Sequence, residues 1–315
     1  MTRHRITVVL LMGLLLAAVV FAPMSGGTRL LRVLHNSAHG PIFGSIAILL
    51  LVGLRSQQRL SELVWPWQYL IAFAGATLLG IATEVAQVPM GRDASWEDVR
   101  NDVLGALGFL ALFAVFSTHL PSRAARIACL LLGLTSLSVL ATPVLVATAA
   151  YARRAADFPV LADFGARFER FFIAVSWAEA QHTRLPETWA RKPGELGLLV
   201  RFGQGPWPGL NFHEPAPDWS GYSMLVLDVT NPDDASLEFT LRIHDSLHNW
   251  EFVDRFNQRL RVPPRTRSIL RVPLSEVKSA PHARPMDLQE IAGMLMFKSS
   301  VSEAKEMYLS RIWLE

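Results

Sequence analysis

Cysteine is almost absent from this chain, because Cys129 is the only one among 315 residues. A disulfide, a CxxC redox pair and a multi-thiolate metal site each need more than one cysteine, so all three are excluded within one chain. Cys129 lies in a long apolar stretch and therefore gives no indication of the redox compartment.

The chain also lacks any concentration of charge of one sign. Its formal net charge is +3, and its basic residues, mostly arginine, are scattered. This distribution excludes the basic footprint of a nucleic-acid-binding protein. The motifs Gly-x-Ser-x-Gly, HExxH and the Walker-type phosphate loop are absent as well, so the sequence indicates no familiar catalytic centre and no cofactor.

Apolar residues make up 51% of the chain and are concentrated in roughly its first 150 positions. This asymmetry predicts two domains, at residues 1–152 and 153–315. Five nearly uncharged stretches approach or exceed the ~30 Å hydrocarbon core of a bilayer. We therefore expect an all-α transmembrane domain with five helices, at residues 6–23, 40–54, 67–83, 102–119 and 126–149. The first stretch also has signal-peptide features, but Pro23 directly after Ala22 disfavours cleavage, so we interpret it as an anchor.

The arginines near the expected helix ends predict the orientation. With the N-terminus in the cytoplasm they divide evenly between the two sides, but the inner loops are shorter and richer in arginine. The positive-inside rule therefore favours this orientation. Five helices then place the C-terminal domain outside the cytoplasm.

Polar residues gather near the ends of three expected helices. Glu84 and Gln87 are three residues apart, as are Asp98 and Asn101, so each pair lies on one helix face. Ionisable groups inside a membrane are unfavourable and usually functional. We predict one polar pocket at the outer membrane face, formed by His39, Glu84, Gln87, Arg92, Asp98 and Asn101.

In this pocket His39 is expected to open the second helix, and Arg92 is the expected partner of Glu84. The alternative is that these residues pair with one another for structure alone. A set of this kind would also suit a hard divalent cation. Nothing in the sequence fixes the number of ligands, so no metal site is expected.

These residues resemble a known family of membrane proteins. The pattern His39 with Phe43, Glu84-x-x-Gln87, Arg92, Asp98-x-x-Asn101, Gly105 and Gly108 is similar to that of the VanZ-like integral membrane family. The resemblance covers about residues 5–120 and implies a small helical domain in the bacterial inner membrane. Phe43 departs from the family's usual tyrosine. The family is named for low-level teicoplanin resistance, which is not transferred to this chain.

The C-terminal domain has the pattern of strands. Short β-rich runs separated by Pro, Gly, Asn and Asp predict an all-β antiparallel sandwich or jelly roll. The expected strands lie at residues 196–202, 222–229, 237–243, 250–256, 268–272, 291–297 and 307–314.

Several segments of this domain resemble a galactose-binding-like sandwich of the carbohydrate-binding-module type. They are residues 207–212, 218–222, 231–232, 241–245, 254–257 and 272–274. The resemblance covers about residues 157–315 and implies a non-catalytic glycan-binding fold.

Sugar binding needs flat apolar surfaces together with planar polar groups. The candidate ligand-binding residues are Trp207, Trp219, Tyr222, Asp245, His248, Asn249, Trp250, Arg255 and Asn257. Trp219 and Tyr222 could instead be core or turn residues. Asp245 and Asp254 could imitate the paired carboxylates of a glycosidase, although sequence does not give their separation.

The leading hypothesis is a bacterial inner-membrane protein that recognises a cell-envelope saccharide or a lipid-linked glycan. It would use the outer polar pocket and a periplasmic sandwich. Two alternatives remain open. One is a membrane enzyme that acts on a lipid-linked substrate, with Glu84 or Asp98 as general base and His39 as acid or ligand. The other is a scaffold that docks a partner protein.

Overall fold

The computed structural model describes residues 3–21, 27–90, 94–120, 122–165, 167–298 and 302–315. The chain divides into two compact units, residues 1–148 and 149–315. The boundary lies four residues before the one expected from the sequence.

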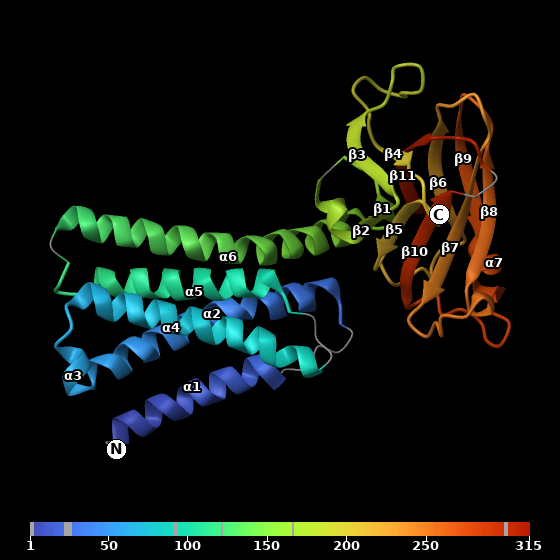
Figure 1. Ribbon diagram of the computed structural model, residues 1–315. Helices are drawn as coiled ribbons and strands as arrows, with labels where there is room; N and C mark the ends of the chain where they lie inside the picture. Colours follow the sequence, from blue (N-terminus) through green and yellow to red (C-terminus); the bar gives the residue numbers. More distant parts are fainter. Residues whose placement is uncertain (1–2, 22–26, 91–93, 121, 166, 299–301) are drawn as a thin grey trace. The chain divides into compact units, whose positions relative to one another are not determined.

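The first unit is a helical bundle whose long helices run side by side (Figure 1). The helices that it contains or begins are α1 (Arg3–Phe21), α2 (Arg29–Arg55), α3 (Gln58–Ser61), α4 (Trp65–Gln87), α5 (Trp96–Val115) and α6 (Arg123–Asp157), with a 3₁₀ turn at Val88–Met90. Within the described residues, α2, α4 and α6 are long and apolar enough to cross a membrane. The sequence predicted five such helices. Of the other two, α1 contains a shorter apolar stretch, Ile6–Ala17, and α5 opens with Glu97, Asp98 and Asp102.

Helix α2 begins eleven residues before the expected start of the second span. The Thr28 hydroxyl accepts a hydrogen bond from the Leu31 N–H at 3.3 Å and caps the helix there. Pro41, a residue that often marks a helix start, lies inside this helix instead. The expectation that His39 opens the helix is therefore wrong, because His39 lies ten residues inside it.

Helices α2 and α5 cross in close contact at glycines. A Cβ atom on Gly105 would lie 2.0 Å from the Gly40 carbonyl oxygen, and one on Gly44 would lie 2.5 Å from the Phe109 ring. Only glycine allows backbones to approach so closely. Since Asp102 lies one turn before Gly105, this crossing brings it beside His39.

The second unit is a sandwich of two antiparallel sheets (Figure 1). Its strands are β1 (Val160–Ala162), β2 (Ile173–Ser176), β3 (Ala178–Arg184), β4 (Leu196–Phe202), β5 (Gly209–His213), β6 (Met224–Asn231), β7 (Leu237–Asp245), β8 (Phe256–Val262), β9 (Thr266–Pro273), β10 (Ile291–Lys298) and β11 (Glu306–Leu314). The six-stranded sheet has the order β3-β4-β11-β6-β9, with β1 also pairing with β11. The five-stranded sheet has the order β2-β5-β10-β7-β8.

Alternating side chains of both sheets form the core. Leu225 and Leu227 of β6 lie opposite the other sheet's Phe239, Leu241 and Ile243 of β7, and all five side chains are fully buried. The all-β antiparallel sandwich predicted from the sequence is therefore confirmed.

One expected strand is wrong. Residues 250–256 contain a 3₁₀ turn, Phe252–Asp254, and strand β8 begins only at Phe256. The Asp254 carboxylate accepts the Asn249 N–H at 2.9 Å, which holds this segment in a closed loop. A short helix, α7 (Leu274–Ser279), follows β9.

Candidate functional sites

Three of the polar residues predicted in the helical unit converge. His39 of α2, Glu84 of α4 and Asp98 of α5 each offer a donor atom, and these atoms lie within 4.8 Å of one another. His39 and Glu84 are buried, with 4% and 3% of their surface exposed. That these three residues form a pocket for a ligand remains a prediction.

Two other predicted residues serve the packing of the helices. The Gln87 side-chain amide donates to the Val19 carbonyl of α1 at 3.3 Å. The Asn101 amide donates to the Asn36 carbonyl of α2 at 3.1 Å. Both amides therefore link helices through backbone oxygens. Arg92, the expected partner of Glu84, lies outside the described residues.

Asp102 is a member of this cluster that the sequence analysis missed. It is 1% exposed, and its Oδ1 atom lies 3.1 Å from Nδ1 of His39. The missed signal was its spacing, since Asp102 lies four residues after Asp98 and so shares its helix face. A Cβ atom on Gly80 of α4 would lie 2.5 Å from Oδ2 of Asp102, so this glycine makes room for the carboxylate.

In the second unit, five of the predicted residues lie on or beside the outer face of the five-stranded sheet. They are Trp207, His248, Trp250, Arg255 and Asn257. The face itself is formed by the side chains that alternate with the core positions of its strands. These outward side chains include Asn211 and His213 of β5, Glu238, Thr240, Arg242 and His244 of β7, Asn257 and Arg259 of β8, and Leu295 and Phe297 of β10.

One end of this face is a hollow beside Trp207. The hollow has a volume of about 440 Å³, and its lining includes Trp207, Thr240, Arg259, Phe297 and Lys298. The Trp207 side chain is 68% exposed. A flat aromatic ring therefore stands next to two cationic side chains that can donate hydrogen bonds.

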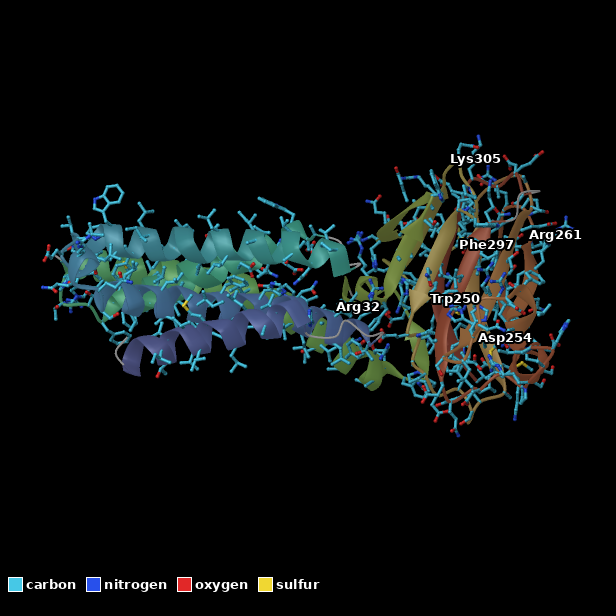
Figure 2. The ribbon with its side chains drawn as sticks, turned by 60° about the horizontal axis from the view of Figure 1, so that its bottom comes forward. Arg32, Trp250, Asp254, Arg261, Phe297 and Lys305 are labelled. Atoms are coloured by element: carbon cyan, nitrogen blue, oxygen red, sulfur yellow. The ribbon has the colours of Figure 1, made fainter. Side chains whose placement is uncertain are left out.

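The other end carries a group of three aromatic rings. The His248 ring lies 5.1 Å from that of His244 and 5.5 Å from that of Trp250. Trp250 is 83% exposed, and Figure 2 labels it together with Phe297. Burial and the neighbouring His248 lower the pKa of His244 to about 4, so its ring is neutral at physiological pH.

Arg242 lies between the two ends. Its guanidinium lies 5.1 Å from the Phe297 ring centroid, and its Nε donates to Oδ1 of Asn257 at 3.4 Å. Arg255 stacks on Phe252 with 5.1 Å to the ring centroid. Arg242 was not predicted from the sequence, although its outward position in the alternating strand β7 indicates it.

Both exposed tryptophans of this face have an unusual backbone. The φ angle is +56° at Trp207 and +71° at Trp250. Side chains larger than asparagine rarely adopt this region, and residues that do so cluster at functional sites.

Four predicted residues are not available for a ligand. His248 is the first, because its side chain is 4% exposed and its Nδ1 atom lies 2.8 Å from the Asp254 carbonyl oxygen. Trp219 is fully buried, and its Nε1–H donates to the carbonyls of Pro215 and Ala216. Tyr222 is half-buried and packs edge-on against Phe158, with ring centroids 5.4 Å apart. Their interpretation as sugar platforms is therefore wrong, and the core or turn alternative holds.

Asp245 is the fourth of these residues, and its environment also excludes a glycosidase-like pair with Asp254. Asp245 is 1% exposed and forms an ion pair with Arg284, which also pairs with Asp254 at 3.1 Å. Burial alone would raise the pKa of Asp245, but Arg284 outweighs it and holds the pKa below its usual value. The Asn249 N–H and then Arg284 lower the pKa of Asp254. Both groups stay ionised, whereas a glycosidase needs one protonated acid.

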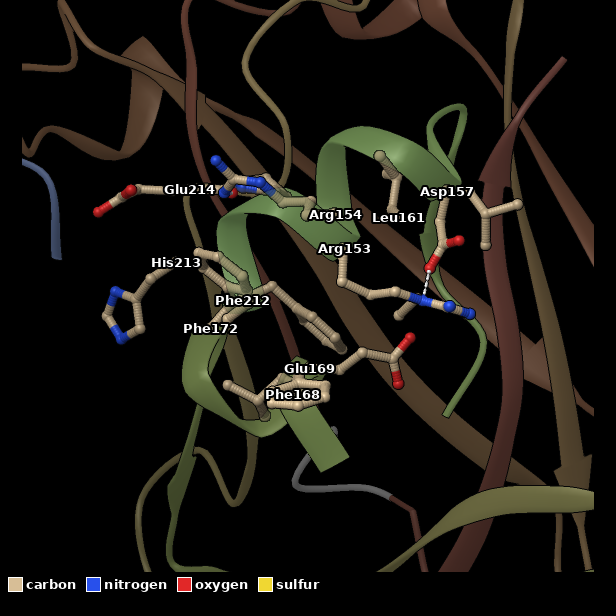
Figure 3. Close-up of a pocket in the computed structure, with 15 residues that line it drawn as sticks. Arg153, Arg154, Asp157, Leu161, Phe168, Glu169, Phe172, Phe212, His213 and Glu214 are labelled. Atoms are coloured by element: carbon tan, nitrogen blue, oxygen red, sulfur yellow. Dashed lines mark hydrogen bonds and ion pairs between the residues drawn. The ribbon is translucent and has the colours of Figure 1, made fainter. Parts of the chain in front are cut away.

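A further pocket at the C-terminal end of α6 is too small for a ligand. It is lined by residues including Arg153, Asp157, Glu169 and Phe172, and Arg153 pairs with Asp157 at 2.5 Å (Figure 3). Its volume of about 30 Å³ holds roughly one water molecule.

Comparison with known proteins gives no family for this chain, since no family model and no curated protein matches it. Solved structures are similar over half of the chain. An exo-beta-agarase is 18% identical with a TM-score of 0.41, over 50% of this chain and 25% of the agarase. The family 11 carbohydrate-binding module of Clostridium thermocellum, solved with a beta-1,3-1,4-mixed-linked tetrasaccharide, is 14% identical with a TM-score of 0.37, over 49% of this chain and 93% of the module. A family 22 xylan-binding domain of Paenibacillus barcinonensis is 13% identical with a TM-score of 0.34, over 49% of this chain and 94% of that domain.

Proposed function

We propose that this chain is a multi-pass bacterial inner-membrane protein with a VanZ-like helical domain and a periplasmic sandwich that binds a saccharide of the cell envelope. The binding surface is the outer face of the five-stranded sheet. The observation that carries this proposal is the pair of exposed tryptophans, Trp207 and Trp250, among arginine and amide side chains. Aromatic rings stack on the apolar faces of sugars, and planar polar groups bind their hydroxyls.

The spacing of the two aromatic ends favours an oligosaccharide. Thr240, at the Trp207 end, and His244, at the Trp250 end, are four residues apart on β7, which corresponds to ~13 Å. A single sugar ring cannot contact both ends.

The charges on this face favour an anionic ligand. Arg242, Arg255, Arg259 and Lys298 contribute positive charge, whereas Glu238 is the acidic residue among the outward positions of β7. Arginine binds phosphate and carboxylate well. A lipid-linked glycan, whose sugars are joined to the lipid through phosphate, therefore suits this surface.

Binding can be measured with the isolated sandwich, residues 149–315, by glycan array and then by isothermal titration calorimetry. We expect a preference for phosphate- or carboxylate-bearing oligosaccharides over monosaccharides. Trp207→Ala and Trp250→Ala should each weaken binding at least tenfold, and Arg242→Met should reduce its dependence on salt. The matched control is Trp313→Ala, because Trp313 lies on the six-stranded sheet.

Equal affinity of the Trp250→Ala and Trp313→Ala proteins would refute this surface as the binding site. Absence of binding to any saccharide, with one partner protein co-purifying, would instead support the scaffold hypothesis.

The membrane topology can be tested by labelling single cysteines in a Cys129→Ser background. Lys192 is exposed in the sandwich, and Gln57 is exposed between α2 and α3. In intact spheroplasts an impermeant maleimide should label Lys192→Cys, whereas Gln57→Cys should react only after lysis. The opposite pattern would place the sandwich in the cytoplasm.

A further inference from the structure

Among the described residues, three carboxylates of the helical unit have a buried oxygen atom without a hydrogen-bond partner. Glu84 accepts the Ser95 N–H through Oε2 at 2.7 Å. Its other oxygen, Oε1, is buried and has no hydrogen-bond partner among the described residues. The same holds for Oδ1 of Asp98 and Oδ2 of Asp102. Buried anionic oxygens are strongly unfavourable unless a cation or a donor satisfies them.

The donor atoms of this cluster have nearly the spacing of a metal site. Those of His39, Glu84 and Asp98 lie within 4.8 Å of one another. A divalent ion with ligand distances of ~2.0–2.2 Å holds its donors ~3.3–3.6 Å apart in tetrahedral geometry. Side-chain rotations that bring the donor atoms about 1.2–1.5 Å closer together would close this difference. The ligands come from α2, α4 and α5, whose approach is set by glycines, so the helices already hold the side chains together.

Asp102 orients the His39 ring. Its Oδ1 atom lies 3.1 Å from Nδ1 of His39, where it can accept a hydrogen bond from Nδ1–H and leave Nε2 to bind a metal ion. Histidine ligands of metal ions commonly donate their other ring nitrogen to a carboxylate in this way. Gly80 of α4 leaves the space that the Asp102 carboxylate needs for this contact.

We propose that His39, Glu84 and Asp98 bind a divalent transition-metal ion, with Asp102 as the residue that positions His39. An imidazole together with two carboxylates favours Zn²⁺ or Mn²⁺ over Mg²⁺ and Ca²⁺, which prefer oxygen ligands alone. This site goes beyond the saccharide surface and does not depend on it, because all four residues lie in the other unit.

The test uses the full chain, purified in detergent through a tag without histidine. The apo protein is prepared with a chelator and titrated with ZnCl₂ or MnCl₂. Bound metal is then counted by elemental mass spectrometry, and bound Mn²⁺ is followed by electron paramagnetic resonance. We expect about one ion per chain. Binding of neither ion by the folded wild-type chain would overturn the proposal without any variant.

Variants then assign the ligands. Glu84→Gln and Asp98→Asn should each lose the ion. The matched control is Glu97→Gln, which removes an exposed carboxylate from the same helical turn and should bind normally. Asp102→Asn should bind the same number of ions with about 10–100-fold lower affinity. Unchanged affinity in a folded Glu84→Gln protein would overturn the assignment.

Discussion

Replacing Gly105 with alanine tests whether the close crossing of α2 and α5 holds the helical unit together. The new Cβ atom would lie 2.0 Å from the Gly40 carbonyl oxygen. This is about 1.4 Å short of ordinary van der Waals contact. Both helices must move, because the obstacle is backbone. Overpacking of this kind destabilises by about 1–3 kcal/mol, which exceeds the 0.5–1 kcal/mol that alanine gains over glycine in a helix.

The assay compares the midpoints of thermal unfolding in detergent. The control is Gly53→Ala in α2, the partner helix of this crossing, where the nearest atom, Val8 Cγ1, lies 3.8 Å from the added Cβ. Gly53→Ala should raise the midpoint slightly, and Gly105→Ala should lower it. A separation of the helices by 1 Å would also stretch the contact between His39 and Asp102 and weaken metal binding. Equal midpoints for the two variants would refute the reasoning.

The remaining predictions concern the free energy of unfolding of the isolated sandwich, measured by urea denaturation. Arg267→Met should reduce the free energy of unfolding by about 3 kcal/mol, the lower end for a broken buried pair, because it removes the shared partner of Glu195 and Asp228 but leaves Asp228 its ion pair with Arg191. The exposed ion pair lost in Arg265→Met should be worth no more than about 1 kcal/mol. The hydrogen bond from Arg267 lowers the pKa of Glu195 to about 2, so its stabilisation is present above pH 4.5 and is lost as the pH falls towards 2. Burial raises the pKa of Glu169 to about 8, so the wild type should lose stability as the pH rises from about 4.5 to 8. Glu169→Gln should remove that loss. The same pH dependence of the free energy of unfolding in the variant and the wild type would contradict this prediction.

The polar cluster was largely predictable because helix periodicity places residues on faces. The pairs at three-residue spacing identified Glu84 and Asp98 without a structure. Sequence did not distinguish the proposed ligands Glu84 and Asp98 from Gln87 and Asn101, since all four share the same spacing. Only the packing of neighbouring helices decides which side chains reach backbone carbonyls and which face one another.

In the sandwich most of the core strands were predictable, but strands β5 and β8 were missed, and the surface was not predictable. Strand β4 was expected at its observed bounds, because a run of apolar residues marks a buried strand. Trp219 and Trp250 have the same chemistry and flank similar turns, yet one is fully buried and the other 83% exposed. That difference depends on tertiary packing, which local pattern does not encode.

The position of β11 has a consequence for biosynthesis. This strand, residues 306–314, lies between β4 and β6 and also pairs with β1. The pairs β3–β4 and β6–β9 therefore cannot join into one sheet until the last residues of the sandwich have left the ribosome. Until then β4 and β6 present unpaired edges, which are sites of aggregation. The sandwich must fold after its synthesis is complete, and its nascent chain should need a chaperone that covers strand edges.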